Sequence, residues 1–196
     1  MKLLYIDGCV SQRGTASRTR RLAEAFFDSF REACPAAQIE TVSLESLDIR
    51  PFLPAALDRR DALARAGDFG GAAFDLARQF RQADKIVVAA PFWDLSFPAL
   101  LRVYIEHISV CGLCYHYESD GCHGDCRASR LLFLTTGGDF ERPESLGVLY
   151  WKQLCAMFGI PRFDYVFAGG LDVDPAQVPS ILADACERAR ALGRVF

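Results

Sequence analysis

The stretch from Lys85 to Ala90 (KIVVAA) restricts the fold more than any other part of the chain. Five consecutive apolar residues, three of them β-branched, are typical of a strand buried on both faces. Beyond it, apolar residues at positions 101, 104, 105 and 108 have the spacing of one helix face. Ser96 is expected to cap this helix, with Pro98 in its first turn, where a missing N–H costs nothing. A doubly buried strand that leads into a helix predicts a parallel sheet covered by helices.

The rest of the chain repeats this alternation of apolar strands and amphipathic helices. Further strands are expected at residues 3–6, 39–44, 131–135 and 163–168, and helices at 17–33, 70–83, 145–158 and 175–192, the last capped by Asp174. A connector over 48–66 is expected to hold a short helix, and residues 115–121 a hairpin. The pattern predicts a single α/β domain over residues 1–196, with a doubly wound, five-stranded parallel sheet and helices on both faces. Five strands at this spacing fit the flavodoxin-like order 2-1-3-4-5, which is inferred from what such folds commonly adopt and not from the alternation itself.

Composition argues against several classes of protein. With 51% hydrophobic and 24% charged residues, the chain has the make-up of an ordinary globular protein. A net charge of −3 argues against general nucleic-acid binding, and no apolar run approaches the ~18–20 residues of a membrane span. The start of the chain fits a strand rather than a signal peptide, so a cytoplasmic location is expected. Its eight cysteines would then be thiols, metal ligands or redox groups rather than structural disulfides.

The loop after the first strand, residues 9–19, is rich in hydroxyl groups. Ser and Thr at positions 11, 15, 17 and 19 lead into the free N–H groups of a helix start, a combination that can bind phosphate. Arginines at 18, 20 and 21 oppose the helix dipole unless an anion is bound there. An ordinary capped helix with a solvated basic turn is the alternative. The chain has neither a P-loop nor a dinucleotide fingerprint. Thr15 stands where a Cys-x5-Arg phosphatase needs arginine, so Cys9 is expected to pack beneath the loop.

Two further loops follow predicted strands. Residues 91–98 carry Phe92, Trp93 and Asp94 between prolines, which suits a flat aromatic ligand with polar edges. Residues 135–140 include Gly137 and Gly138, which let the backbone approach a ligand, although a plain glycine turn is the alternative. Ligands bind at the carboxyl ends of the strands in such a sheet. The three loops together therefore describe a site for flavin mononucleotide (FMN), with the phosphate at the first loop, the ring along the second and the ring's polar edge at the third.

The same segments are similar to those of a known family. Residues 90–101 (APFWDLSFPALL) resemble the aromatic flavin-contacting segment of FMN-dependent NAD(P)H azoreductases, a branch of the flavodoxin-like quinone reductases. Residues 17–23 resemble that family's phosphate loop and helix start, 115–121 its hairpin, and 135–138 its Gly-Gly segment. The resemblance extends from residue 1 to about residue 170.

This resemblance implies non-covalent FMN, a homodimer with flavins at the subunit interface, and ping-pong transfer of two electrons from NADH or NADPH to a quinone, azo compound or similar small aromatic acceptor. No catalytic side chain is expected, because the flavin carries the electrons. By position, the implied cofactor contacts are Cys9, Ser17, Arg18, Thr19, Pro91, Phe92, Trp93, Asp94, Leu95, Thr136, Gly137 and Gly138.

Asp94 departs from the family pattern, because azoreductases often have asparagine at this place. An ionised carboxylate only accepts hydrogen bonds, so Asp94 could accept from the flavin N3–H and make the flavin harder to reduce. Bonding of Asp94 to nearby backbone is the alternative. Trp93, Phe97 and Phe140 are the candidate contacts to the nicotinamide or the acceptor, with core packing as the alternative for Trp93 and Phe97.

Half of the cysteines lie around the predicted hairpin, at Cys111, Cys114, Cys122 and Cys126, with His123 among them. The family resemblance does not explain them. Two such pairs could form a tetrahedral metal site, but the C-x3-C spacing and the short intervening loop argue against a zinc ribbon. No metal is therefore predicted, and redox-active thiols or unligated packing cysteines are the alternatives. The other histidines, at 107 and 116, are expected at the surface or an interface.

These observations leave more than one function open. The first is an enzyme, an FMN-dependent NAD(P)H oxidoreductase of the azoreductase or quinone reductase type. The second is a flavin-binding electron carrier or cysteine-based redox sensor without NAD(P)H turnover, and a flavodoxin-like binding protein without flavin is a third. The segments 48–70 and 115–121 favour the enzyme, since they could wall an active site in a dimer.

Overall fold

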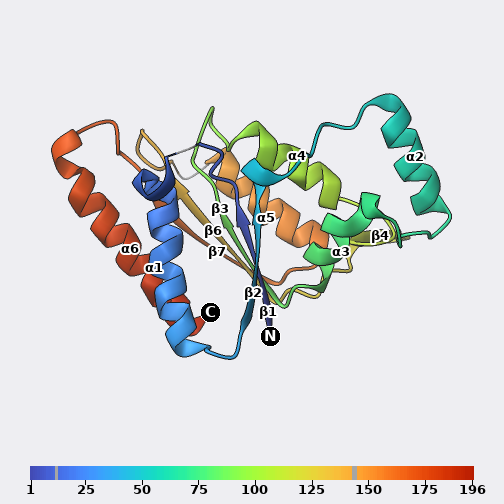
Figure 1. Ribbon diagram of the computed structural model, residues 1–196, viewed down its shortest axis with the longest axis horizontal. Helices are drawn as coiled ribbons and strands as arrows, with labels where there is room; N and C mark the ends of the chain where they lie inside the picture. The colour runs from blue at the N-terminus through green and yellow to red at the C-terminus, as the bar shows by residue number, and fades with distance from the viewer. Residues whose placement is uncertain (12, 143–144) are drawn as a thin grey trace.

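The computed structural model of the chain describes residues 1–11, 13–142 and 145–196. Five parallel strands form the central sheet, in the order β2-β1-β3-β6-β7 (Figure 1). They are β1 (Lys2–Asp7), β2 (Gln38–Ser43), β3 (Lys85–Ala89), β6 (Arg130–Thr136) and β7 (Arg162–Ala168). The remaining two strands, β4 (Tyr115–Glu118) and β5 (Gly121–Gly124), pair antiparallel in a separate hairpin, as the sequence predicted.

Helices cover both faces of the sheet (Figure 1). On one face lie α1 (Arg18–Ala33) and α6 (Val178–Val195), and on the other α3 (Asp75–Gln82), α4 (Ala99–Ile108) and α5 (Leu146–Phe158). The connector helix α2 (Pro54–Arg65) lies further out, beside the hairpin. Short 3-10 turns occupy Gly14–Ala16, Leu44–Ser46, Ala72–Phe74 and Pro175–Gln177. The α/β class expected from the alternation is therefore confirmed.

Strand β3 is buried on both faces, as its composition predicted. Ile86 and Val88 belong to the core on the α4 and α5 side, whereas Val87 and Ala89 belong to the core on the α1 and α6 side. This division follows from the two-residue period of a strand. The same alternation runs along β6, so the two central strands tie both cores together.

Two expected helix caps are wrong. Helix α4 begins at Ala99 with Pro98 at its N-cap and no side-chain cap, so Pro98 precedes the first turn and Ser96 is not the cap. The backbone N–H of Ser96 instead donates to Trp93 O (2.8 Å), closing a tight turn that intervenes before the helix. Asp174 accepts a hydrogen bond from the N–H of Ala176 (2.9 Å) and so caps the preceding 3-10 turn rather than α6.

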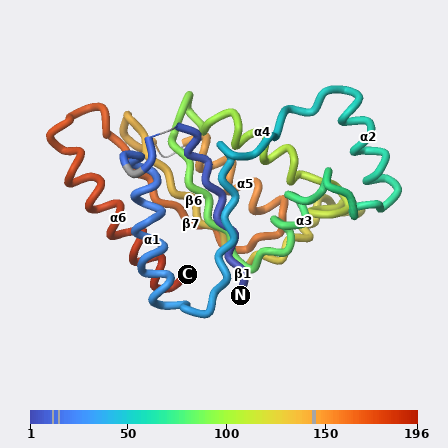
Figure 2. The backbone as a smooth tube through the Cα atoms, viewed as in Figure 1, coloured from blue at the N-terminus to red at the C-terminus, as the bar shows by residue number. Residues whose placement is uncertain are grey.

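The parallel arrangement brings the carboxyl ends of β1, β3, β6 and β7 to one edge of the sheet. Figure 2 shows the loops after these strands at that edge, with the N-terminus of the chain at the opposite one. Ligand sites in sheets of this kind lie at the carboxyl edge. Among the residues described, no helix combines the length and the apolar composition that crossing a bilayer requires.

Candidate cofactor site

A cavity of about 120 Å³ lies at the carboxyl ends of β1, β3 and β6. Its walls come from the loops after these three strands and from the loop after β7. Ten of the residues expected to contact FMN line it: Cys9, Ser17, Arg18, Thr19, Pro91, Phe92, Trp93, Thr136, Gly137 and Gly138. Segments more than a hundred residues apart meet here because parallel strands end at the same edge.

The first wall is the start of α1, which is rich in hydrogen-bond donors. Ser17 is the N-cap, and its Oγ accepts from the N–H of Arg20 at 3.3 Å, so the hydroxyl hydrogen remains available to donate. The first N–H groups of an α-helix have no partner within the helix. Ser11 and Arg13 line the same cavity, while the side chain of Thr15 lies outside the structure's description. This wall can therefore hold an anion.

The arginines of this helix start have different partners. Arg20 forms ion pairs with Asp7 (2.9 Å) and Glu45 (3.2 Å) and donates to Cys9 O (2.9 Å), so it fastens the loop to the sheet. Arg18 lies at the cavity, where its Nη1 is 2.9 Å from Asp172 Oδ1. The ion pair between Arg18 and Asp172 is exposed to solvent and therefore weak. Arg18 can thus still contribute positive charge to a ligand at the start of the helix.

Asp172 and Leu171 were not expected from the sequence, yet both line the cavity. They follow Gly169-Gly170 directly after β7, at the same edge as the other loops. Their N–H groups donate to Gly138 O (3.0 Å) and Gly137 O (3.2 Å), which joins this loop to the Gly-Gly segment. The rule that located the other loops, a polar segment after a buried strand, could have found them.

The Gly-Gly segment packs closely against Phe167 and Asp172. A Cβ on Gly137 would lie 2.9 Å from the ring of Phe167, and one on Gly138 would lie 2.4 Å from Asp172 Oδ2. Behind this segment the hydroxyl of Thr136 contacts that of Thr19 at 2.6 Å, and Thr136 O accepts from the N–H of Phe92 at 2.9 Å. These bonds connect the three predicted loops into one surface.

Cys9 lies beneath the loop, as the sequence suggested. Its side chain is buried, with Sγ 3.8 Å from Ala89 O. Burial, reinforced by the nearby carboxylate of Asp7, raises the pKa of the Cys9 thiol to about 12. The thiol is therefore neutral near pH 7 and is not a nucleophile.

The aromatic loop contains a turn of unusual backbone geometry. Asp94 and Leu95 have positive φ values of 50° and 65°, and with the Trp93-to-Ser96 hydrogen bond these make a type I′ turn. This conformation is tolerated by aspartate but costly for leucine. The turn leaves the side chains of Trp93 and Leu95 exposed. Asp94 lines neither this cavity nor a second, larger cavity beside it.

A second cavity of about 410 Å³ adjoins the first, because Phe92 lines both. Its other lining residues are Leu95, Asp139, Phe140, Arg142, Ser145, Leu146 and Phe167. Of the expected substrate contacts, Phe140 lies here and Trp93 lies in the first cavity. Phe97 lines neither: its buried ring packs against Tyr150 (5.7 Å between centroids) and Trp151 (6.3 Å), so the structure places it in the core.

The four cysteines around the hairpin differ in their surroundings. Cys111 and Cys122 are exposed, Cys114 is buried, and Cys126 is half-buried. A hydrogen bond with Cys114 and then burial raise the pKa of Cys126, so this thiol is held protonated. Within the described part of the chain, the one close group of three or more potential metal ligands is Glu118, Asp120 and His123, which contains no cysteine.

The residues at the first cavity fit the FMN that the sequence suggested. Hydroxyl, guanidinium and helix N–H donors suit a phosphate, and an adjoining aromatic wall suits a flat ring. A doubly wound parallel sheet with such a cavity at its strand ends has the flavodoxin-like architecture. A family model described as flavodoxin-like fold matches residues 1–192, and the chain belongs to that family.

Among curated relatives, the chain is similar to two proteins named FMN-dependent NADH:quinone oxidoreductase. The one from Clostridium beijerinckii is 31% identical over 197 residues, and the one from Bacillus pumilus is 32% identical over 216 residues. Both alignments cover 100% of this chain and 99% of the relative. The similarity is therefore to whole proteins rather than to parts of them.

Solved structures show the same fold. An azoreductase from Bacillus anthracis str. Sterne superposes with a TM-score of 0.87 at 22% identity, covering 100% of both chains. A FMN-dependent NADH-azoreductase from Bacillus anthracis str. Ames Ancestor, in complex with FMN, has a TM-score of 0.80 at 19% identity and covers 98% of this chain and 99% of that one.

Proposed function

We propose that this protein binds FMN and passes two electrons from NADH or NADPH to a quinone, azo compound or similar small aromatic acceptor. The observation that carries the proposal is a cavity that joins a donor-rich helix start to an aromatic loop and a Gly-Gly backbone. The names of the full-length relatives, FMN-dependent NADH:quinone oxidoreductase, support the same activity.

The smaller cavity suits the phosphate end of the cofactor. Its 120 Å³ is well below the ~300–1,000 Å³ of a typical small-molecule pocket, so it accommodates part of a nucleotide rather than all of it. Ser17 and Thr19 would donate hydroxyl hydrogens, and Arg18 would supply charge. A bound phosphate would also neutralise Arg13 and Arg18 at the positive end of α1.

The ring would lie along Pro91, Phe92, Trp93 and Leu95, with the backbone of Gly137 and Gly138 at its edge. FMN, when bound, supplies the two-electron chemistry, while the protein binds and orients it. Asp94 lines neither cavity, so it would accept from a ring N–H only if its exposed side chain turned towards the ring, where an ionised carboxylate offers acceptors only.

The larger cavity would take the donor and the acceptor in turn, in a ping-pong order. Its apolar wall, formed by Phe92, Phe140, Leu146 and Phe167, suits flat aromatic molecules, and its 410 Å³ is the size of a site for one such molecule. Arg142 and Asp139 at its edge form an ion pair at 2.9 Å, so this rim offers both a donor and an acceptor to the polar groups of a bound molecule.

We also propose that two copies of the chain assemble at this cavity. Trp93, Leu95, Phe140 and Leu146 are large apolar residues exposed around it. Exposed apolar residues gathered in one place are typical of an interaction surface, and a second copy would shield the ring from water.

All eight cysteines are free, which supports a reducing, cytoplasmic location.

The experiment is a flavin and turnover assay on purified protein. We expect yellow protein after FMN addition, bleaching on anaerobic addition of NADH or NADPH, and recovery of absorbance with a quinone. Sedimentation should give twice the chain mass. Protein that cannot be loaded with FMN would overturn the proposal. Loaded protein that nicotinamide never reduces would favour the electron carrier instead.

A further inference from the structure

The hairpin of β4 and β5 places two histidines directly opposite each other. His116 pairs with His123 in the antiparallel register, and the two rings stack at 5.7 Å between centroids. Because side chains two residues apart share one face of a strand, Glu118 lies on the face of His116. Asp125, one residue beyond β5, reaches the same face, since its carboxylate contacts His116. Each side of the hairpin thus contributes a His-x-acid pair, and Asp120 joins them from the turn.

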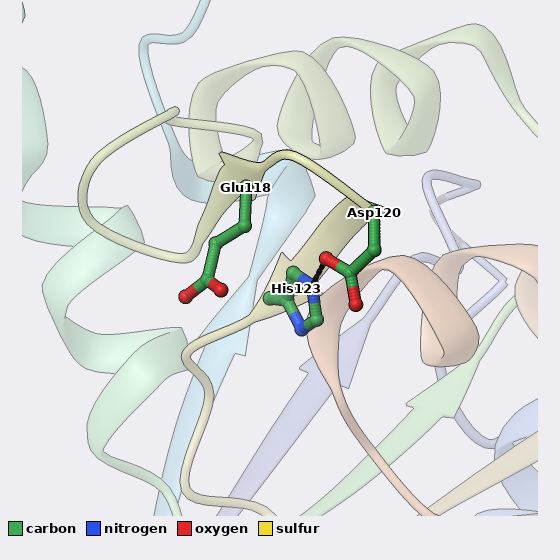
Figure 3. Close-up of side chains that lie close together, drawn as sticks. All are labelled: Glu118, Asp120 and His123. Carbon is green, nitrogen blue, oxygen red and sulfur yellow. Dashed lines mark hydrogen bonds and ion pairs between the residues drawn. The ribbon is translucent and has the colours of Figure 1, made fainter.

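Carboxylates surround both imidazole rings. His116 Nδ1 lies 2.8 Å from Asp125 Oδ2, and its Nε2 lies 3.1 Å from Glu118 Oε1. His123 Nε2 lies 2.7 Å from Asp120 Oδ1. Figure 3 shows Glu118 and Asp120 on either side of the His123 ring, and ligand atoms of these three residues lie within 4.8 Å of one another.

We propose that this face of the hairpin is a binding site for a divalent transition-metal ion such as Zn²⁺, with Glu118, Asp120 and His123 as ligands. His116 approaches Glu118 but lies outside that close group of three, and it becomes the fourth ligand when the side chains draw together around the ion. Imidazole nitrogen and carboxylate oxygen are ligands that zinc accepts, usually four in a tetrahedron. Tetrahedral ligands at about 2.0–2.1 Å from zinc are about 3.3 Å from each other. The separation between His116 Nε2 and Glu118 Oε1, 3.1 Å, is close to this value, whereas that between His123 Nε2 and Asp120 Oδ1, 2.7 Å, is shorter and would widen as both atoms turn to the ion.

Asp125 has a different role in this arrangement. Its contact with Nδ1 fixes the orientation of the His116 ring and leaves Nε2 for the ion. Metal-bound histidines commonly have such a carboxylate partner on their second nitrogen. Asp125 is itself held in place, since its N–H donates to Cys114 O at 2.9 Å.

The charge of this face favours a cation. With both imidazoles neutral, Glu118, Asp120 and Asp125 give it three negative charges. The ligand side chains are accessible to solvent, so an ion can reach them and the side chains are free to turn towards it.

The nearby cysteines are not part of the proposed site. Cys122 pairs with Tyr117, one residue out of step with the histidines, and so faces the other side of the hairpin. The base of the hairpin is fixed against the end of α5: a Cβ on Gly124 would lie 1.9 Å from the carbonyl carbon of Phe158 and from Gly159 N. The ligand face therefore stands on a rigid support.

The test is titration of the FMN-loaded, chelator-treated protein with Zn²⁺ by calorimetry and with Co²⁺ by visible absorption. We expect one ion per chain and Co²⁺ bands without thiolate charge transfer. His123→Asn and Glu118→Gln should each weaken Zn²⁺ binding at least about 10-fold, and Asp125→Asn about 10–100-fold. Circular dichroism and flavin absorbance establish that each variant is folded.

Two further variants serve as matched controls. His107→Gln removes the chain's remaining histidine, which contacts Arg50 O away from the hairpin, and should leave the affinity unchanged. Cys122→Ser should also leave it unchanged. Absence of saturable binding up to about 1 mM Zn²⁺, equal affinity in His123→Asn, or loss of binding in Cys122→Ser would each overturn the proposal. None of these measurements depends on electron transfer, so failure of the proposed enzymatic activity would be recognised separately.

Discussion

The hydroxyl of Thr19, in the first turn of α1, lies 2.6 Å from the hydroxyl of Thr136, the last residue of β6. Both residues are buried, and one hydroxyl donates while the other accepts. This bond joins the proposed phosphate-binding helix start to the Gly-Gly segment. The two walls of the cavity are therefore held at a set distance before any ligand arrives.

Loss of this bond should destabilise the protein. Thr19→Val keeps the shape of the side chain but leaves the buried Thr136 hydroxyl without its partner, at a cost of about 1–3 kcal/mol in the free energy of unfolding. Guanidinium unfolding measures it. The double variant with Thr136→Val should recover part of the loss, because both polar groups are then gone. If the double variant lost as much stability as the two single variants together, this coupling would be contradicted.

Arg18 and Asp172 should have opposite effects on FMN affinity. Arg18→Ala removes a cation at the proposed phosphate position and should weaken binding about 10-fold or more, as expected for a hydrogen bond to a charged group. Asp172→Asn removes the competing anion and should strengthen binding about fivefold at low salt, since a charge at ~4 Å in water is worth about 1 kcal/mol. Fluorescence titration measures both.

Riboflavin is the control ligand for this pair of variants, because it has the flavin ring but no phosphate. Its affinity should be the same in both variants and the unmodified protein. If Arg18→Ala weakened riboflavin as much as FMN, the arginine would act through the shape of the loop rather than through the phosphate.

The backbone conformation of Leu95 should lower the free energy of unfolding, while its side chain contributes to the proposed acceptor site. Its φ of 65° costs a leucine about 1–2 kcal/mol, whereas glycine adopts this φ freely and costs only unfolded-state entropy. Leu95→Gly should therefore raise the free energy of unfolding by up to about 1 kcal/mol. It should also raise KM for the acceptor, because Leu95 lines the larger cavity.

Leu57→Gly is the matched control for Leu95→Gly. Leu57 is also an exposed leucine, but it lies inside α2, where its backbone is helical. Glycine there should lower the free energy of unfolding by about 1 kcal/mol and leave KM unchanged. A stability gain in both variants would mean that removal of an exposed leucine, rather than relief of the turn, is responsible.

The Cys9 thiol should make stability depend on pH in the alkaline range. Its pKa is about 12 in the folded protein against 9.0 for an ordinary cysteine, so above pH 9 the unfolded chain loses this proton first. The stabilisation is complete below pH 9 and declines as the pH rises towards 12, by at most about 1.4 kcal/mol per unit. Guanidinium unfolding of the protein and of Cys9→Ala between pH 8 and 11 should show their difference shrinking.

Ser29→Ala provides the comparison, because Ser29 is buried like Cys9 but its hydroxyl does not ionise between pH 8 and 11. The stability difference that it produces should stay constant over the same range. A constant difference for Cys9→Ala as well would show that the buried thiol ionises as readily in the folded protein as in the unfolded chain.

Much of the fold could be predicted because its signals are local. The run at 85–90 is apolar on both faces, and the structure buries Val87 and Val88 in opposite cores. The loops at 9–19, 91–98 and 135–140 were located by the strands that precede them. Ser96 was assigned as a cap wrongly, since the positive φ of Asp94 and Leu95 turns the chain before the helix, and neither residue type signals such a turn reliably.

The sequence by itself determined the order of strands and helices and the chemistry of the loops at the strand ends, because periodicity and turn residues act over a few neighbours. Only the tertiary structure decided that Asp172 meets Arg18, that Phe97 turns into the core, and that His116 stands opposite His123. These contacts depend on which strands are adjacent, on register, and on the side to which each side chain points. The sequence therefore predicted a donor-rich helix start, an aromatic loop and a Gly-Gly loop, and the packing of β1, β3, β6 and β7 brought them to one cavity.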